Sequence, residues 1–129
     1  MDTIFSKIIK REIPADIVYE DDSSLAFLDI HPVAKGHVLL ISKNPYPWIQ
    51  DVPDEELASL FIKAKKLVQT MKEKLPCDFV QLGVVGKDVP HFHIHLIPRF
   101  MNDGLGDSPT TEYSGEEERK VFADKIRLQ

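Results

Sequence analysis

The sequence predicts an α+β fold in which an antiparallel sheet packs against one long helix. Three observations carry this prediction. Apolar residues recur at the spacing of an amphipathic helix from Leu57 to Met71. Two short apolar runs, at 16–20 and 24–30, flank a polar turn and so indicate a hairpin. Histidines alternate with apolar residues over 91–98, which is the period of a strand.

The first half of the chain supplies the remaining early elements. Apolar residues at helical spacing predict a short helix over 3–10, which Asp2 or Thr3 can cap. A third strand is expected over 36–42, and its continuous apolar run favours a central position in the sheet. The next segment, 44–48, contains two prolines, so we expect no regular structure there.

The long helix is expected to be capped by Asp54 and to end before Pro76. A fourth strand is expected over 79–85, and a turn over 86–90 leads into the histidine strand. The apolar face predicted for the helix consists of Leu57, Leu60, Phe61, Ala64, Leu67, Val68 and Met71.

Glycine, proline and small polar residues over 99–114 predict a mobile loop. A last helix is expected to start at Ser114, with Glu117 completing a capping box. The side chains expected to pack this helix are Val121, Phe122 and Ile126.

Length and composition favour one domain over 1–129, with its core at 3–100 and the C-terminal loop and helix at 101–129. The formal net charge of −5 argues against nucleic-acid binding through a basic surface. We recognise no signal peptide and no apolar run long enough to span a membrane. Together with the single cysteine, Cys77, these features predict a cytoplasmic protein without a membrane partner.

In a strand, His91, His93 and His95 point to one face, while the apolar residues between them bury the other. Three imidazoles in a row are an unusual way to build a core, because each ring must find hydrogen-bond partners or stay wet. We therefore predict a functional site, for which two kinds of chemistry stay open. One is a metal site, since imidazole suits zinc and copper. The other is histidine chemistry on a phosphate or acyl group.

The run from His91 to Ile97 matches the His-φ-His-φ-His-φ-φ signature, where φ is apolar, of the histidine triad (HIT) superfamily. Over roughly residues 3–100, the chain also resembles the histidine triad nucleotide-binding (Hint) branch of bacterial type. Because the similar segments extend over most of the chain, the resemblance is more specific than the histidine triplet alone. The segments that carry it are Thr3–Ile9, Arg11–Ala15, Tyr19–Asp22, Leu25–Ile30 and Gly36-His37.

The resemblance implies a five-stranded antiparallel sheet with one long helix and short terminal helices, usually in a homodimer. It also implies a hydrolase that acts at the α-phosphate of a purine nucleotide through a covalent nucleotidyl-histidine and releases AMP or GMP. By matching positions, His93 would be the nucleophile and His95 would bind phosphate oxygens. His91 and His37 would orient the neighbouring rings.

The same resemblance places a nucleotide around these histidines. Asp29 would bind the ribose hydroxyls, and Gly86, Lys87 and Asp88 would approach the phosphates from the turn. Gln81 stands where the Hint branch has asparagine. The residues around the base would be Ile4, Phe5, Ile8, Phe27 and Ile30.

We expect no cofactor and no metal. Many relatives hold a structural zinc through two early cysteines, but Thr3 and Ser6 occupy those places here. The uridylyltransferase-like branch typically has His-Pro-His-x-Gln, and Phe92 and His95 differ from it, which favours a hydrolase. Two alternatives stay open: a nucleotide-binding or sensing protein with little catalysis, and a three-histidine metalloprotein.

Overall fold

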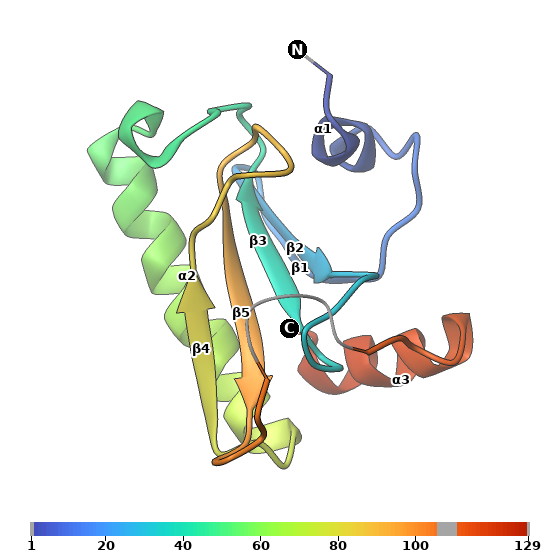
Figure 1. Cartoon of the computed structure of the whole chain (residues 1–129). Coiled ribbons are helices and arrows are strands. Elements are labelled where there is room, and N and C mark those ends of the chain that lie inside the picture. Colours follow the sequence, from blue (N-terminus) through green and yellow to red (C-terminus); the bar gives the residue numbers. More distant parts are fainter. Residues whose placement is uncertain (1, 106–110, 129) are drawn as a thin grey trace.

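The computed structural model describes residues 2–105 and 111–128 and confirms the α+β prediction (Figure 1). Its elements in chain order are α1 (Ile4–Ile9), β1 (Ile17–Glu20), β2 (Ser24–Leu28), β3 (Val38–Ser42), the 3-10 helix η1 (Ile49–Asp51), α2 (Asp54–Lys74), β4 (Phe79–Gly83), β5 (His93–Arg99) and α3 (Glu116–Ile126). The strands form one antiparallel sheet in the order β1-β2-β3-β5-β4, so β3 is central, as expected.

Side chains that alternate along the strands build a separate apolar cluster on each face of the sheet. On one face, Leu40 and Ile94 belong to the larger cluster, which α2 and α3 cover. On the other face, Phe27 and Ile41 pack with Phe5 of α1. Figure 1 shows α1 and α2 well apart, with the central strands between them. The face opposite α2 is therefore only partly covered, which leaves room for a site.

The short helix α1 is held at its start by a capping box. The Thr3 hydroxyl accepts the N–H of Ser6 at 3.2 Å, and the Ser6 hydroxyl accepts the N–H of Thr3 at 2.7 Å. Of the two caps that the sequence allowed, Thr3 is therefore the one used. Thr3 and Ser6 thus have a structural role at the start of this helix.

The two other helices begin differently from the prediction. Asp54 is the first residue of α2 rather than its cap, and Pro53 occupies the cap position. Helix α3 begins at Glu116 after Gly115, so the expected capping box at Ser114 is wrong. Instead, the N–H of Ser114 donates to the Glu118 carboxylate at 2.8 Å, one residue beyond the partner expected.

Two residues predicted to pack on helix faces are exposed. Phe61 of α2 is 39% exposed and Val121 of α3 is 51% exposed. Helix α2 meets the sheet through a narrower stripe, centred on Leu60, Ala64 and Leu67, than the sequence pattern suggested. Within the described ranges, no helix combines the length and apolar character that a membrane crossing requires.

The histidine strand is shorter at its start than predicted. Strand β5 begins at His93, because the backbone at 91–92 bonds outside the sheet: the N–H of His91 donates to the Val89 carbonyl and that of Phe92 to the Tyr46 carbonyl. The alternation still holds, since Phe92 joins the cluster under α2. Part of the loop predicted over 99–114 lies outside the described residues, at 106–110.

Candidate active site

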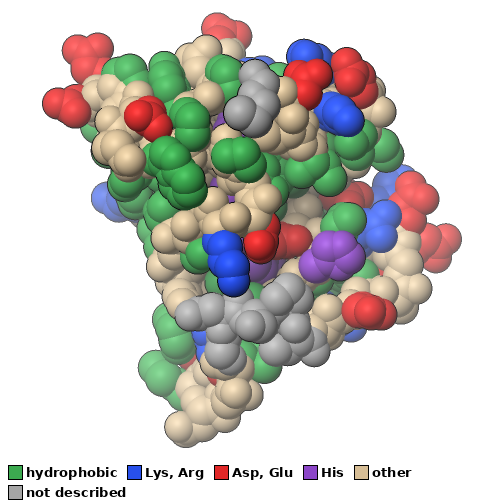
Figure 2. All heavy atoms as spheres, turned by 45° about the horizontal axis from the view of Figure 1, so that its top comes forward, with side chains coloured by type: hydrophobic (Ala, Val, Ile, Leu, Met, Phe, Trp, Pro, Cys, Tyr) green, Lys and Arg blue, Asp and Glu red, His purple; other side chains and the backbone are tan. Residues whose placement is uncertain are grey.

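A cavity of about 410 Å³ opens between α1, the sheet face opposite α2 and the turn before β5. This volume is in the range of small-molecule sites. Figure 2 shows histidine and acidic side chains in and beside a hollow, with hydrophobic side chains along part of its edge. The predicted site residues that line the cavity are Ile4, Phe5, Ile8, Phe27, Asp29, Ile30, Asp88, His93 and His95.

The imidazole ring of His93 is oriented by a hydrogen bond to the main chain. Its Nδ1 lies 2.7 Å from the carbonyl oxygen of His91, and a carbonyl can only accept a hydrogen bond. The ring proton therefore sits on Nδ1, and Nε2 of the neutral ring carries a lone pair. Burial lowers the pKa of His93, which keeps the ring neutral at pH 7. The Phe5 ring meets this imidazole edge to face, at 4.9 Å between ring centres.

His95 and His37 form a chain of hydrogen bonds that fixes both tautomers. The N–H of Val33 donates to His37 Nδ1 at 3.1 Å, so the His37 proton sits on Nε2. That Nε2 lies 2.9 Å from His95 Nδ1 and donates to it. The proton of a neutral His95 therefore sits on its own Nε2. Burial, and less strongly the neighbouring His95 and His93, lowers the pKa of His37 to about 3, so this ring stays neutral.

His91 lies behind the cavity rather than in its wall. Its Nε2–H donates to the Ser42 carbonyl at 2.7 Å, and burial lowers its pKa. The buried Nδ1 has no hydrogen-bond partner within the described part of the chain. His91 therefore contacts His93 through its backbone carbonyl, whereas His37 contacts His95 through its ring.

Asp29 emerges where β2 ends, beside these rings. One carboxylate oxygen accepts the N–H of His31 at 2.9 Å, and the other lies 3.8 Å from His37 Nε2. Its backbone N–H donates to the His37 carbonyl at 2.9 Å, which ties the end of β2 to the start of β3. Burial raises the pKa of the Asp29 carboxyl group.

The turn between β4 and β5 forms the remaining wall. Gly86 does not line the cavity; it is buried with a positive φ of 72°, and a Cβ atom there would lie 2.9 Å from the Trp48 ring. Asp88 lines the cavity, while the neighbouring Lys87 is exposed and does not. Gln81 lies on β4 outside the cavity, where its side-chain oxygen accepts a 2.5 Å hydrogen bond from Arg99.

The structure adds several wall residues that sequence reasoning missed. Some follow directly from a residue already named: His31 comes next to Ile30, and Leu39 lies opposite His95 in the sheet register. Leu28 is the last residue of β2, and the others come from the segment after α1 and from the turn before β5. The additional wall residues are Ile13, Pro14, Ala15, Leu28, His31, Leu39 and Val89.

One group among the described residues has the spacing of a metal site. Asp29, His37 and His95 offer ligand atoms within 4.8 Å of one another. This group differs from the three histidines of the sequence triplet, because His37 and Asp29 replace His91 and His93. An ion bound there would have to break the 2.9 Å hydrogen bond between His37 and His95.

Fold and cavity thus define an α+β protein in which His93, bonded to a backbone carbonyl, and the hydrogen-bonded pair His37–His95 lie beside an apolar pocket. The model of the HIT domain family matches residues 10–102, and the chain belongs to this family. A HIT-like protein of Methanocaldococcus jannaschii is 45% identical over 106 residues, which cover 78% of this chain and 81% of that protein.

Two further relatives bear on function and fold. The adenosine 5'-monophosphoramidase of Saccharomyces cerevisiae is 42% identical over 97 residues, which cover 74% of this chain and 61% of that enzyme. A Hit-like protein from Bartonella henselae, known from its crystal structure, has 31% sequence identity to this chain. The two structures match with a TM-score of 0.88 over 98% of this chain and 94% of that one.

Replacing Gly86 with alanine should destabilise the protein. The left-handed backbone would cost a residue with a side chain about 1–2 kcal/mol, and the new methyl group would press on the Trp48 ring. Urea unfolding, followed through the fluorescence of the single tryptophan, measures the loss. Gly83→Ala is the matched control, since no described atom lies within 4 Å of its Cβ position. Equal losses in the two variants would contradict this account of the turn.

Proposed function

We propose that this protein is a hydrolase that acts at the α-phosphate of a purine nucleotide and releases AMP or GMP. The observation that carries the proposal is the hydrogen bond from His93 Nδ1 to the His91 carbonyl, which leaves Nε2 with a lone pair for attack. The similarity to the yeast adenosine 5'-monophosphoramidase supports a nucleoside phosphoramidate as substrate. Dinucleoside polyphosphates and acyl-adenylates offer the same α-phosphate chemistry.

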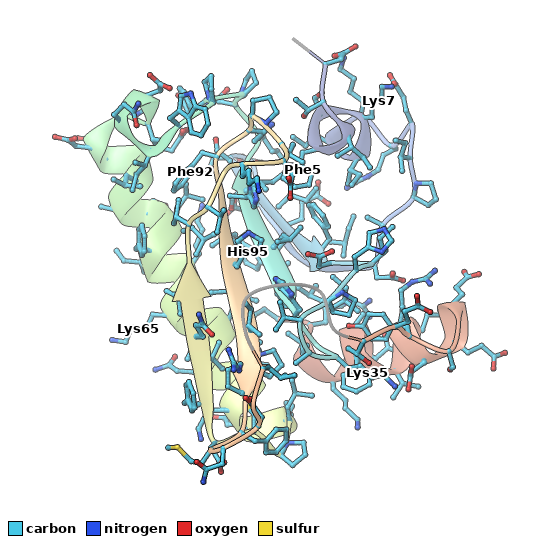
Figure 3. All side chains as sticks on the ribbon, in the orientation of Figure 1. Phe5, Lys7, Lys35, Lys65, Phe92 and His95 are labelled. Carbon is cyan, nitrogen blue, oxygen red and sulfur yellow. The ribbon has the colours of Figure 1, made fainter. Side chains whose placement is uncertain are left out.

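We propose that the base, ribose and phosphate of a nucleotide would contact different parts of the cavity wall. The base would lie against its apolar wall, where Phe5 and Phe27 are buried and the exposed side chains of Ile4 and Ile30 form the rim. Asp29 would accept hydrogen bonds from the ribose hydroxyls, because an ionised carboxylate has acceptors only. Figure 3 shows Phe5 and His95 reaching toward this space from α1 and β5.

The α-phosphate would then lie at His93 and His95, whose ring centres are 4.9 Å apart. In the first step, His93 Nε2 attacks phosphorus. The new phosphorus–nitrogen bond forms as the bond to the leaving amine breaks, and the amine takes a proton from water. In the second step, the hydroxide that remains attacks phosphorus, which releases AMP and restores His93.

Charge that builds on the phosphoryl oxygens needs fixed donors, and this need is the main electrostatic demand of phosphoryl transfer. The Nε2–H of His95 would supply one such donor, because His37 occupies Nδ1 of that ring. His37 would act only through His95. Its low pKa keeps it neutral, so it would not place a second cation beside His95.

A metal-dependent reaction is the second candidate, and the close grouping of Asp29, His37 and His95 is the observation that favours it. A nucleotide-binding or sensing protein with little catalysis is the third. The three candidate functions differ in two measurable properties: whether the protein turns over a nucleotide substrate, and whether metal chelation abolishes that activity.

His93→Ala should abolish turnover of adenosine 5'-phosphoramidate while AMP binding persists. Without the nucleophile, kcat should fall by roughly a thousandfold or more, because water must attack the substrate directly. AMP release is followed by chromatography with EDTA present, and AMP binding by calorimetry, which also shows that the variant is folded. Diadenosine tetraphosphate as a second substrate ranks the leaving groups.

Three results would contradict the proposal in different ways. Turnover by His93→Ala at the wild-type rate would remove His93 as nucleophile. Loss of wild-type activity on chelation, with recovery on adding zinc, would favour the metal site. Tight AMP binding without turnover of either substrate would favour a nucleotide-binding protein.

We also propose a homodimer formed through β4 and α2. Strand β4 pairs only with β5 among the described strands, so its outer edge is open. Exposed apolar side chains lie on both elements, including Ile62 of α2 and Leu82 of β4. Figure 1 shows α2 running beside this edge of the sheet. Such an edge with apolar neighbours is a typical association surface.

Light scattering should therefore give twice the chain mass of 14.7 kDa. The pair Ile62→Glu and Leu82→Glu should reduce it to a single chain, because each change buries a charge in the interface. Val121→Glu on α3 is the control, since it adds a charge to an equally exposed apolar position elsewhere. A wild-type protein with the mass of one chain at micromolar concentration would refute the dimer.

A further inference from the structure

The C-terminal segment contacts the loop that carries His37, although it lies beyond residues 10–102 that match the family model. The backbone N–H of Gly36 donates to the Tyr113 hydroxyl at 2.8 Å. Beside it, Lys35 forms a 3.0 Å ion pair with Glu118 of α3. Figure 3 shows Lys35 where this loop meets α3. A segment distant in the chain thus holds the residues immediately before His37.

The held loop is a tight turn with little room to adjust. The N–H of His37 donates to the Ala34 carbonyl at 3.0 Å, which closes a four-residue turn. Gly36 is its third residue and has a positive φ of 96°, as glycine allows there. A Cβ on Gly36 would lie 2.9 Å from Leu75 and 3.5 Å from Phe122, so the turn is packed against the core and α3.

The position of this turn determines which ring nitrogens of His37 and His95 carry a proton. The N–H of Val33, just before the turn, donates to His37 Nδ1 and so fixes the proton on Nε2. The Nε2–H of His37 in turn donates a hydrogen bond to His95 Nδ1. A shift of the turn would release the His37 ring, and His95 could then carry its proton on the wrong nitrogen for the phosphate.

We propose that Tyr113 is a positioning residue, whose hydroxyl fixes the Gly36–His37 turn so that His95 presents its Nε2–H to the substrate phosphate. The importance of this hydrogen bond for rate rests on the proposed function, whereas its effect on the His37–His95 pair does not. Burial raises the pKa of Tyr113 to about 12, so the hydroxyl is neutral at pH 7 and able to accept. Its ring packs edge to face on Phe122 at 5.8 Å, which holds the hydroxyl in place.

Tyr113→Phe tests the proposal, because it removes only the hydroxyl and keeps the ring against Phe122. We expect kcat for adenosine 5'-phosphoramidate to fall about tenfold, the effect of roughly one buried hydrogen bond. KM should change less than about twofold, since the base and ribose contacts are untouched. In ¹⁵N-histidine spectra, which distinguish protonated from bare ring nitrogens, the signals of His37 and His95 should shift from their wild-type positions.

Two control variants separate positioning from general loss of stability. Tyr19→Phe removes a hydroxyl that bonds Asp21 at 2.6 Å, in the hairpin outside the cavity. Ile126→Val weakens the packing of α3 at a fully buried position, and Ile126 is not among the three side chains nearest to a Cβ atom on Gly36. Both should keep wild-type kcat and wild-type histidine spectra.

The outcomes are distinct from those that decide the proposed function. Unchanged kcat and spectra in Tyr113→Phe, or an equal loss in Ile126→Val, would overturn the positioning role. If the wild-type protein hydrolyses neither substrate, the proposed function fails. The histidine spectra alone then decide whether Tyr113 has the positioning role. Shifted His37 and His95 signals in Tyr113→Phe would then still support the role, and unshifted signals would end it.

Discussion

The 2.7 Å hydrogen bond between His93 Nδ1 and the carbonyl of His91 is the interaction on which the chemistry of this site depends. A backbone oxygen has no proton to give, so the tautomer of His93 is fixed by the main chain rather than by another titratable group. Burial keeps the ring neutral. The site therefore has a nitrogen lone pair at neutral pH and needs no separate base to activate it.

The arrangement of strands in the sheet explains why the other side chains of the site lie close to His93. Strand β3 lies beside β5 in antiparallel register, with Leu39 opposite His95, so His37, two residues earlier and just before β3, lies diagonally from His95 on the same face. Strand β2 ends beside the start of β3, which brings in Asp29. Alternation places the remaining side chains of these strands in the core. The packing that stabilises the fold is thus the same packing that positions the site.

Much of this arrangement follows from the sequence pattern. The alternation over 91–98 placed the three imidazoles on one face, and the apolar run over 36–42 predicted a central strand. The pattern could not predict that Phe61 would point to solvent, because helical spacing gives a wide apolar face and not the part that meets the sheet. It also could not predict that Tyr113 reaches Gly36, since such a contact depends on tertiary packing.

The most direct test of the central claim is to trap the covalent intermediate. Wild-type protein is mixed with adenosine 5'-phosphoramidate, quenched within one turnover in alkali, where a phosphorus–nitrogen bond to histidine survives, and analysed by peptide mass spectrometry. The account predicts an adenylyl group on His93, the ring whose Nε2 the His91 carbonyl leaves free to attack. An adenylyl group on His95, or continued turnover with no adduct on any histidine, would contradict it.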